Sequence, residues 1–459
     1  MGGLAFVHAM EGMYVRQIFV SGHRGCDVEQ SGRLEWLLTN GLGGFSSGTV
    51  AGVNTRRYHG LLIAAPGGPD RFLLMSQLHE EILIGGKKWH LGAFRYRDCV
   101  HPRGHELLLR FTLYPVPQWI FFGGSWVLQK RIGMVHGQNT TVVHYRLLAA
   151  STRLEMLLRP FVAVRHYHAL QRRDAAHLSV EPGANWHCVK SSQAGPHVWL
   201  ASSAAFAPDS VWYNNVVYPM ETARGLDDEE DLLVPGEFRQ HLDVDDEVWF
   251  VATTEPEGVS WASLGQVFER TERRRRALLH QAGDPQGVEA NLVVAADAFI
   301  IRNQGSTSVI AGYPWFTDWG RDAMISLPGL FLATGRASEA LEVLTTFAQA
   351  ERDGLIPNRF PDRSEIPEYN TVDAPLWFIY ACYKYLRYTG DSDGLKPLWP
   401  VIKRIINGYR RGCAFGIGVD ERGLVHAGAR GVQLTWMDAK VGDWVVTPRQ
   451  GYPVEITAL

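Results

Sequence analysis

The segment from residue 311 to residue 329 reads AGYPWFTDWGRDAMISLPG, and it indicates the class of the carboxy-terminal half of the chain. A loop rich in Trp, Asp and Pro leads here into a helix that apolar spacing predicts over residues 322–334. A second loop of this kind leads into a helix predicted over residues 372–389. Between them, a plain Gly335-Arg336 link follows the first helix. We call the loops rich in Trp, Asp and Pro decorated loops. Their alternation with short plain loops indicates a ring of α-hairpins, with the functional residues on the rim that the decorated loops form.

Further helices are predicted from about residue 260 onward. Apolar residues at helical spacing mark residues 264–282, 288–302, 337–352 and 395–412, and another helix begins at Pro453. A closed ring of six hairpins needs about twelve helices, and the sequence supplies about half of them. A half ring exposes apolar faces meant for its neighbours. We therefore expect an incomplete α/α six-hairpin toroid in a chain that is truncated at its carboxy terminus.

The preceding part of the chain, from about residue 15 to 255, has a different sequence pattern. Short runs in which apolar and polar residues alternate are separated there by Gly, Pro, Asn and Asp. This alternation is typical of antiparallel strands. Strands are predicted at residues 72–75, 119–122, 125–132, 140–147, 198–201 and 248–252. The sequence thus predicts an antiparallel β-sandwich over residues 1–258, a helical linker over 259–287 and the first half of an α/α barrel over 288–459.

Charge and hydropathy exclude two classes of partner. The chain of 459 residues has 45 basic and 48 acidic side chains, a formal charge of −3, so no global field attracts nucleic acid or anionic lipid. No run of about 18 uncharged apolar residues occurs, so no membrane span is predicted. The first 20 residues lack the basic start and apolar run of an export signal.

Cysteine and histidine spacing predicts no metal site and no cofactor. The five cysteines are scattered and lack CxxC spacing, which fits a reducing cytoplasm better than a disulfide framework or a zinc site. His166 and His168 alternate on a predicted strand and share a face, but a third ligand is not in view.

Three decorated segments carry the candidate functional residues. The first holds Trp315, Asp318, Trp319, Arg321 and Asp322 directly before and within a helix. An N-terminal cap would explain Asp318 alone. Capping does not require two tryptophans and an arginine, so we also expect a binding site here.

The second segment, residues 354–378, carries Glu368, Asn370 and Asp373 ahead of the next helix. Asp373 could equally serve as a helix cap. Hydrogen-bonding groups at high density beside aromatic rings are typical of sugar sites.

The third segment, residues 431–456, contains Trp436, Asp438, Lys440 and Glu455. A carboxyl group beside a large aromatic ring is partly desolvated, which raises its pKa and lets it act as a general acid near neutral pH. The sequence therefore predicts Asp438 as an acid suited to cleaving a glycosidic bond. In the amino-terminal half, a polar cluster at residues 54–59 is expected to reach toward a neighbouring cleft.

Five motifs together resemble the glycogen debranching enzyme (amylo-α-1,6-glucosidase) family of bacteria and archaea. They cover nearly the whole chain from about residue 31 and follow one another at plausible separations. The motifs are WLLTNGLGGFSSGTVAGVNTRRYHGLL (36–62), YPWFTDWGRDAMISLPG (313–329), GLIPNRFPD (354–362), PEYNTVDAPLWF (367–378) and LTWMDAKVGDWVVTPRQGYPVEI (434–456).

The resemblance implies a β-sandwich followed by an α/α six-hairpin barrel similar to those of glucoamylases and trehalases. It also implies inverting hydrolysis of α-1,6-linked glucose at the branch points of glycogen and limit dextrins, without a cofactor. Branched α-glucan is then the partner, and the oligomeric state stays open. The sequence contains no separate glucanotransferase barrel, and the resemblance leaves transferase activity open.

The resemblance also assigns roles. TWMD looks like the motif of the general acid, which makes Asp438 the acid and Asp322 the fallback, while Asp322 and Asp373 grip hydroxyls of the terminal glucose. The general base of such barrels lies in the last helices, beyond Leu459, and Glu455 is expected to order the rim or bind sugar. The substrate-binding candidates are Trp315, Asp318, Trp319, Arg321, Glu368, Asn370, Trp436, Lys440 and Glu455.

Two other functions fit the same motifs. One is a related exo-glucosidase of the glucoamylase or trehalase kind. The other is a glucan-binding fragment without catalytic activity, which the half ring suggests.

Overall fold

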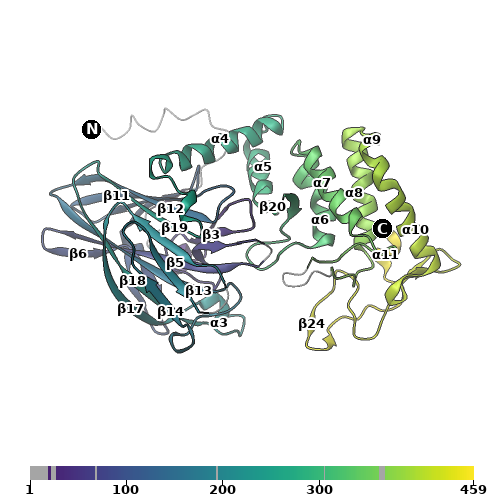
Figure 1. Ribbon diagram of the computed structural model, residues 1–459, viewed down its shortest axis with the longest axis horizontal. Helices are drawn as coiled ribbons and strands as arrows, with labels where there is room; N and C mark the ends of the chain where they lie inside the picture. Colours follow the sequence, from purple (N-terminus) through teal and green to yellow (C-terminus); the bar gives the residue numbers. More distant parts are fainter. Residues whose placement is uncertain (1–18, 22–26, 68–69, 193–194, 304, 361–366) are drawn as a thin grey trace. The chain divides into compact units, whose positions relative to one another are not determined.

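The computed structural model describes residues 19–21, 27–67, 70–192, 195–303, 305–360 and 367–459 (Figure 1). The amino-terminal segment, Cys26 and residues 361–366 of the second decorated segment lie outside these ranges. The chain divides into two compact units, Met1–Ala277 with Gln286–Asn291, and Leu278–Pro285 with Leu292–Leu459. The residues of the expected linker are thus shared between the two units.

The first unit contains two large antiparallel sheets (Figure 1) and a separate two-stranded sheet of β7 (Ala93–Arg95) and β8 (Val100–Arg103). One sheet has nine strands in the order β1-β9-β10-β11-β12-β19-β16-β15-β14, and the other has eight in the order β17-β18-β13-β5-β4-β3-β2 with β6 beside β5. The strands of the first sheet are β1 (Phe19–Ser21), β9 (Leu108–Thr112), β10 (Gln118–Phe122), β11 (Trp126–Met134), β12 (Thr140–Ala150), β14 (Leu178–Glu181), β15 (His187–Ser191), β16 (Val198–Ser202) and β19 (Glu247–Thr253). Those of the second are β2 (Glu35–Thr39), β3 (Phe45–Thr49), β4 (Gly60–Ala64), β5 (Phe72–Ile84), β6 (Lys87–His90), β13 (Leu154–His166), β17 (Ala205–Val217) and β18 (Glu229–Leu242).

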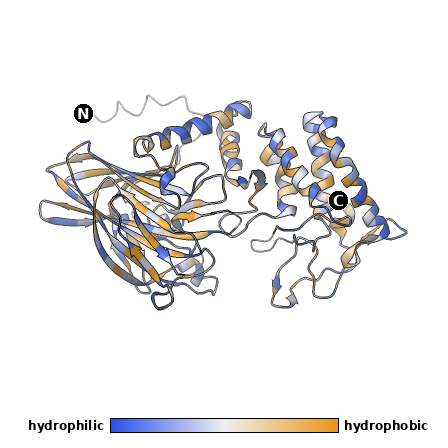
Figure 2. Ribbon diagram, in the orientation of Figure 1, coloured by the Kyte–Doolittle hydropathy of each residue, from blue (hydrophilic) through white to orange (hydrophobic). Residues whose placement is uncertain are grey.

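Apolar side chains from both sheets form one core. Trp36 and Leu62 of the second sheet belong to the same buried cluster as Trp119, Leu128 and Phe250 of the first. Figure 2 shows apolar and polar residues alternating along many of these strands. The predicted antiparallel β-sandwich is confirmed.

One strand is much longer than the sequence predicts. The strand expected over residues 72–75 continues as β5 to Ile84, through the polar run Gln77–Glu81. Polar residues broke the apolar alternation on which the prediction rested, yet His79, Glu80 and Glu81 are buried. Their hydrogen bonds and ion pairs replace apolar contacts inside this sheet.

Another sequence prediction in the first unit is wrong. Strand β13 ends at His166, and His168 lies in the following turn with its ring Nδ1 3.0 Å from Tyr58 Oη. The two histidines therefore do not alternate on a strand. Within the polar cluster 54–59, Asn54 and Arg57 are buried and donate to Ser76 and to the carbonyl of Asp227, both in the first unit. That the cluster reaches toward a neighbouring cleft stays a prediction.

The second unit is mainly helical. Its elements, with the helices that join the two units, are α4 (Gln266–Gln281), α5 (Gly287–Phe299), the hairpin β20 (Ile300–Asn303) and β21 (Ser306–Val309), α6 (Gly320–Leu327), a π-helical turn (Pro328–Leu332), α7 (Ala337–Gln349), α8 (Ala374–Thr389), α9 (Ser392–Leu395), α10 (Trp399–Arg411), the short hairpins β22–β23 (Gly418–Val419, Val425–His426) and β24–β25 (Lys440–Val441, Trp444–Val445), and α11 (Val454–Ala458). The helix expected over 288–302 ends at Phe299, because Ile300 and Ile301 pair with β21 instead. Closure of these helices into a six-hairpin ring stays a prediction.

Buried apolar faces hold the helices of this unit together. Helix α10 is strongly amphipathic and buries Val401, Ile402, Ile405 and Tyr409. Gly335, after the π-helical turn, has a φ of +76°, and a Cβ there would lie 2.4 Å from the carbonyl oxygen of Gln281. Only glycine satisfies both conditions, as expected for the plain link between two helices.

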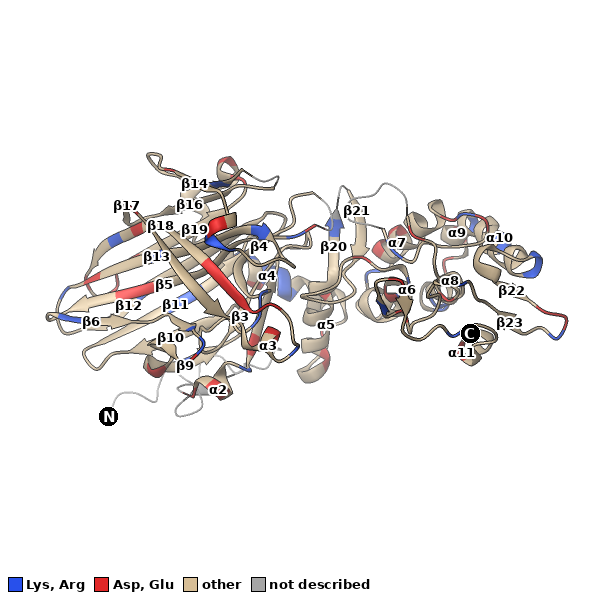
Figure 3. Cartoon of the chain, turned by 90° about the horizontal axis from the view of Figure 1, so that it is seen from below, with Lys and Arg blue, Asp and Glu red and all other residues tan. Residues whose placement is uncertain are grey.

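Charge is dispersed over the chain. Figure 3 shows Lys and Arg interspersed with Asp and Glu along the strands and helices. Among the described residues, every helix is too short or too polar to cross a membrane.

Candidate active site

One arginine holds two of the candidate carboxylates together. Arg321 lies in the first turn of α6, and its side chain is only 8% exposed. Its Nε donates to Asp373 Oδ2 over 2.7 Å, and its Nη1 donates to Asp438 Oδ2 over 3.1 Å. The three residues come from three decorated segments, so the guanidinium gathers those segments at one place.

Asp322 belongs to the same cluster. It follows Arg321 in α6 and lies at the solvent-exposed edge. Neighbouring protein atoms displace part of its water and raise its pKa; the charges of Asp438 and Asp373 act in the same direction, against that of Arg321. The three aspartates named from the sequence therefore share one electrostatic environment around Arg321.

The start of α6 fixes the place of Arg321. Gly320 donates its N–H to the carbonyl of Asn358 over 2.8 Å, and a Cβ at Gly320 would lie 2.2 Å from the carbonyl oxygen of Pro357. Only glycine allows the first helical turn to approach the second decorated segment so closely. An isolated bridge between Trp319 and Arg359 continues this contact.

Asp373 stands at the N-cap position of α8, but it does not cap the helix. Its Oδ2 accepts from Arg321, and its Oδ1 accepts from the Thr371 hydroxyl over 2.7 Å. The Ala374 N–H donates to Thr371 instead. The side chain of Asp373 is 3% exposed. The capping alternative is thus wrong for Asp373, because its carboxylate forms the ion pair with Arg321.

One hydrogen bond joins the third segment to the second, and another joins helix α10 to the second. Val372 N–H donates to the carbonyl of Leu434 over 2.8 Å, and Tyr409 of α10 donates its hydroxyl to the carbonyl of Val372 over 2.6 Å. The chain then turns through Thr435 to Asp438. This arrangement explains why residues more than sixty positions apart in the sequence reach one arginine.

The surroundings of Asp438 differ from the sequence prediction. We expected an indole-lined, desolvated carboxyl group. Instead, the side chain of Asp438 is 34% exposed and pairs with Arg321, and Trp436 is 56% exposed. Because more than half of Trp436 is exposed, its indole does not shield Asp438 from water.

The desolvated carboxyl group of the site is Asp318. Its Oδ2 accepts a hydrogen bond from the Ser308 hydroxyl of β21, while its Oδ1 is buried without a hydrogen-bond partner among the described residues. Burial raises the pKa of Asp318 to about 6, and the nearby charge of Asp322 contributes. Because Trp319 occupies the N-cap position of α6, the capping alternative is also wrong for Asp318.

Two other candidates, Trp319 and Glu368, form a second small group with Arg359. The Arg359 guanidinium lies 5.5 Å from the centre of the Trp319 ring and pairs with Glu368 over 3.0 Å. Glu368 and Arg359 also share a backbone bridge. This group joins the first decorated segment to the second.

The remaining candidates are more scattered. Trp315 is half-buried in the loop before α6, and Asn370 is half-buried between Glu368 and Asp373. Lys440 is exposed in the β24–β25 hairpin. Glu455, in the first turn of α11, accepts a hydrogen bond from Arg449.

Several buried polar atoms of these segments are left without a hydrogen-bond partner among the described residues. They are Asp318 Oδ1, Arg321 Nη2, Asn358 Oδ1 and Asn370 Oδ1. Native proteins contain few such atoms, and a group of them in one place requires an explanation. Both donors and acceptors are present, and a polyhydroxylated ligand such as a sugar can satisfy both kinds.

The sequence did not point to three residues that build this site. Ser308 lies in a hairpin hidden behind an apparent helix. Asn358 contacts the neighbouring segments through its backbone, and Arg359 contacts Trp319 and Glu368 with its side chain. The motif GLIPNRFPD, which contains Asn358 and Arg359, was the available signal for two of them.

Each of the two units matches the model of a known protein family. Residues 34–249 match the family model described as "Glycogen debranching enzyme N terminal", and residues 294–459 match "Amylo-alpha-1,6-glucosidase". The chain belongs to the glycogen debranching enzyme family. This confirms the resemblance of the five motifs; a bacterial or archaeal type stays a prediction.

A curated relative of the family is the glycogen debranching enzyme of Saccharomyces cerevisiae. It is 28% identical over 220 residues, which cover 35% of this chain and 14% of the yeast protein. The match to this debranching enzyme thus spans about one seventh of the relative's length.

Solved structures give weaker likenesses. A bacterial glucoamylase complexed with acarbose has a TM-score of 0.45 at 12% identity, over 84% of this chain and 59% of the other. A family GH92 α-mannosidase from Bacteroides thetaiotaomicron has a TM-score of 0.31 at 11% identity, over 82% and 66%. Both scores are too low to bear on the fold or the mechanism.

Proposed function

We propose that the cluster around Arg321 is the glucose-binding centre of an amylo-α-1,6-glucosidase that acts on branched α-glucan. The observation that carries this proposal is the set of buried donors and acceptors that have no hydrogen-bond partner among the described residues, in the segments that also carry the three aspartates. Membership of the debranching enzyme family supports a carbohydrate substrate, and within that class we propose branched α-glucan. A cytoplasmic location is proposed on the cysteine pattern of the sequence alone.

The cluster favours Asp438 as general acid over Asp373. Both carboxylate oxygens of Asp373 are engaged inside the protein, by Arg321 and by Thr371, so neither can reach a leaving oxygen. Asp438 uses one oxygen for Arg321 and is partly exposed, which leaves the other available to substrate. Asp373 then acts as a positioning residue for Arg321.

Asp322 is the second candidate for the acid, because it is accessible and its pKa is raised. Asp318 has the more suitable pKa, but its free oxygen is buried. A bound glucose would have to enter this recess for Asp318 to donate a proton. We therefore propose that Asp318 binds a sugar hydroxyl.

Inverting hydrolysis also needs a base about 6.5–9.5 Å from the acid, on the other face of the sugar. Glu455 is engaged by Arg449, which supports a role in ordering the rim. We propose that the base comes from a residue outside the cluster. The proton balance is then complete: the acid protonates the leaving oxygen, and the base takes one proton from the attacking water.

The test is glucose release from three substrates, a panose-like α-1,6-linked trisaccharide, maltose and trehalose. Release from the α-1,6 linkage, with β-glucose as the first product seen by NMR, supports the proposal. Release mainly from maltose or trehalose would identify a related exo-glucosidase. Binding of a branched dextrin without any release would favour the glucan-binding fragment.

A further inference from the structure

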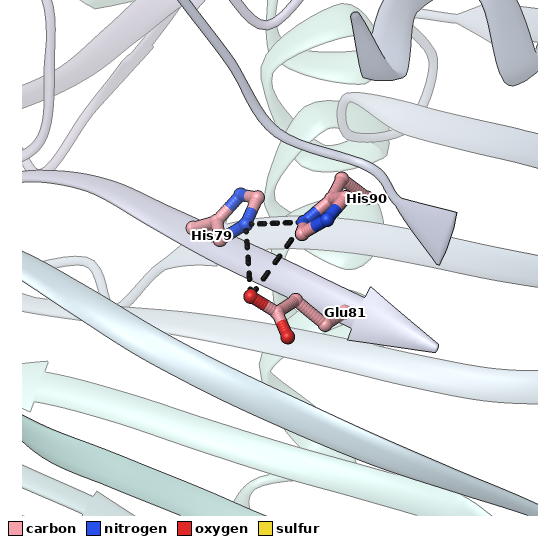
Figure 4. A group of neighbouring side chains, drawn as sticks. All are labelled: His79, Glu81 and His90. Carbon is pink, nitrogen blue, oxygen red and sulfur yellow. Dashed lines mark hydrogen bonds and ion pairs between the residues drawn. The ribbon is translucent and has the colours of Figure 1, made fainter. Parts of the chain in front are cut away.

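A group of two histidines and one glutamate lies in the first unit, far along the sequence from the cluster around Arg321. His79 and Glu81 are two positions apart on β5, so they share one face of the sheet, and His90 on β6 is paired with Glu81 in the strand register. Figure 4 shows the three side chains pointing toward one another from the two strands. The group is therefore built by the β5–β6 hairpin itself.

The turn of this hairpin fixes the register. Gly85 and Gly86 are the only residues between β5 and β6, and their φ angles are +55° and +73°. Two consecutive residues with positive φ are the requirement of a tight two-residue hairpin turn. A slip by one residue would turn His90 to the other face, away from Glu81.

Three ligand atoms converge at this place. His79 Nε2 lies 3.2 Å from His90 Nδ1, and Glu81 Oε1 lies 3.6 Å from the first and 3.5 Å from the second. A proton can bridge only one pair of these atoms. In a tetrahedral site with bonds of 2.0–2.1 Å, neighbouring ligand atoms are about 3.3–3.4 Å apart. The observed triangle already has nearly this size.

The three ligands differ in their access to solvent. His79 and Glu81 are 4% and 3% exposed, whereas the His90 side chain is 35% exposed and leaves a path for an ion and a water molecule. Neutral imidazole and ionised carboxylate are the forms in which such side chains bind a metal.

Two cations already contact Glu81 and must share it. Lys88 Nζ lies 2.9 Å from Oε2, the oxygen that faces away from the triangle, and Lys88 is half exposed and can move into solvent. Arg159 donates to Oε1 and also holds Glu237 over 2.7 Å, so it keeps a carboxylate partner when Glu81 binds an ion. Glu81 can therefore take a metal without leaving either cation unpaired.

We propose that the β5–β6 hairpin binds one divalent cation of the zinc class through His79, Glu81 and His90, with water as the fourth ligand. The donor set determines the class, because imidazole suits zinc and cobalt, whereas calcium and magnesium prefer oxygen ligands. The cation would lock the hairpin to the sheet. The proposal departs from the sequence prediction of no metal site and does not depend on the glucosidase function.

The experiment uses the whole chain, freed of metal by chelation. Zinc is titrated into the wild type, His90→Gln and His241→Gln by calorimetry, and cobalt is added to each to record visible absorption. The His90 side chain is 35% exposed, so its replacement spares the core, and His241 on β18 is an exposed histidine outside the group. Thermal unfolding with and without zinc shows whether each variant is folded.

One site per chain is expected in the wild type and in His241→Gln, with the intense absorption of tetrahedral cobalt and a zinc-dependent rise in Tm. His90→Gln should bind zinc more than about a hundredfold more weakly. The loss of a residue that only hydrogen-bonds to a metal ligand already lowers metal affinity about 10- to 100-fold, and His90 is itself a ligand. Excess calcium or magnesium should not compete. Equal zinc affinity in His90→Gln, or the absence of any one-to-one binding in the wild type, would overturn the proposal.

Discussion

Replacing Asp318 by Asn should make the protein more stable at neutral pH and leave it unchanged in acid. The reason is the buried Oδ1 of Asp318, which finds no hydrogen-bond partner among the described residues. A charge on such a carboxyl group destabilises the folded state. An amide of the same shape carries no charge and still accepts the hydrogen bond from Ser308.

The size of the effect follows from the pKa of Asp318. Its folded-state value of about 6 lies above the ordinary value of 3.8, so the folded protein holds the extra proton between these two pH values. Protonation therefore stabilises the fold fully below the unfolded pKa, and this contribution is lost as the pH rises through about 6. Since one pKa unit corresponds to about 1.4 kcal/mol, the charge on Asp318 costs up to ~3 kcal/mol at neutral pH.

The assay is urea unfolding of the wild type and Asp318→Asn at several pH values between 4 and 8, followed by helical circular dichroism. The difference in the free energy of unfolding should be small at pH 4 and should grow through pH 6 to a few kcal/mol. Asp443→Asn, in the exposed turn between β24 and β25, is the control and should show no such growth. A constant difference over this range would refute the argument.

Three further substitutions test the cluster around Arg321. Arg321→Gln leaves Asp373 buried without its cation and should lower the free energy of unfolding by about 3–5 kcal/mol, measured by urea unfolding; a loss below 1 kcal/mol would contradict the buried ion pair. Asp438→Asn should keep binding of branched dextrin but lower kcat for glucose release by about 10²–10⁴-fold, and unchanged turnover would move the acid role to Asp322 or Asp318. Gly320→Ala places a Cβ 2.2 Å from the carbonyl oxygen of Pro357 and should destabilise by about 1–3 kcal/mol, whereas Gly329→Ala, where a Cβ meets nothing within 4 Å, should be neutral or stabilising; equal effects would show that helix propensity, not contact, sets the cost.

The sequence predicted the architecture where local pattern and burial agree. Alternation in residues 140–147 and 248–252 predicted β12 and β19, which pair in the first sheet. It failed where a buried segment is polar, as in β5 at His79–Glu81, because ion pairs take the place of apolar contacts there. It also failed at Ile300–Ile301, where apolar residues fit both a helix and a strand.

The candidate site, too, was predicted from the sequence only in part. Motif and residue type identified Arg321, Asp373 and Asp438, and the structure joins all three. Which carboxyl group is desolvated could not be predicted, because it depends on the contact of Asp318 with Ser308 and on the outward position of Trp436. Both depend on tertiary packing that spacing in the sequence does not encode.

The histidine pair of the hairpin was within reach of sequence reasoning. A His-x-Glu pattern on a strand, a Gly-Gly turn and a histidine at the matching position of the next strand place three ligands on one face. Counting the strand pairing outward from the Gly85-Gly86 turn places His90 opposite Glu81.

The most direct test of the glucose-binding centre is a crystal structure of the chain with a panose-like trisaccharide. The terminal glucose should lie within hydrogen-bond distance of Arg321 Nη2 and Asp438, with a hydroxyl at Asp318 Oδ1. A trisaccharide bound at another surface, with these three side chains left untouched, would contradict the assignment.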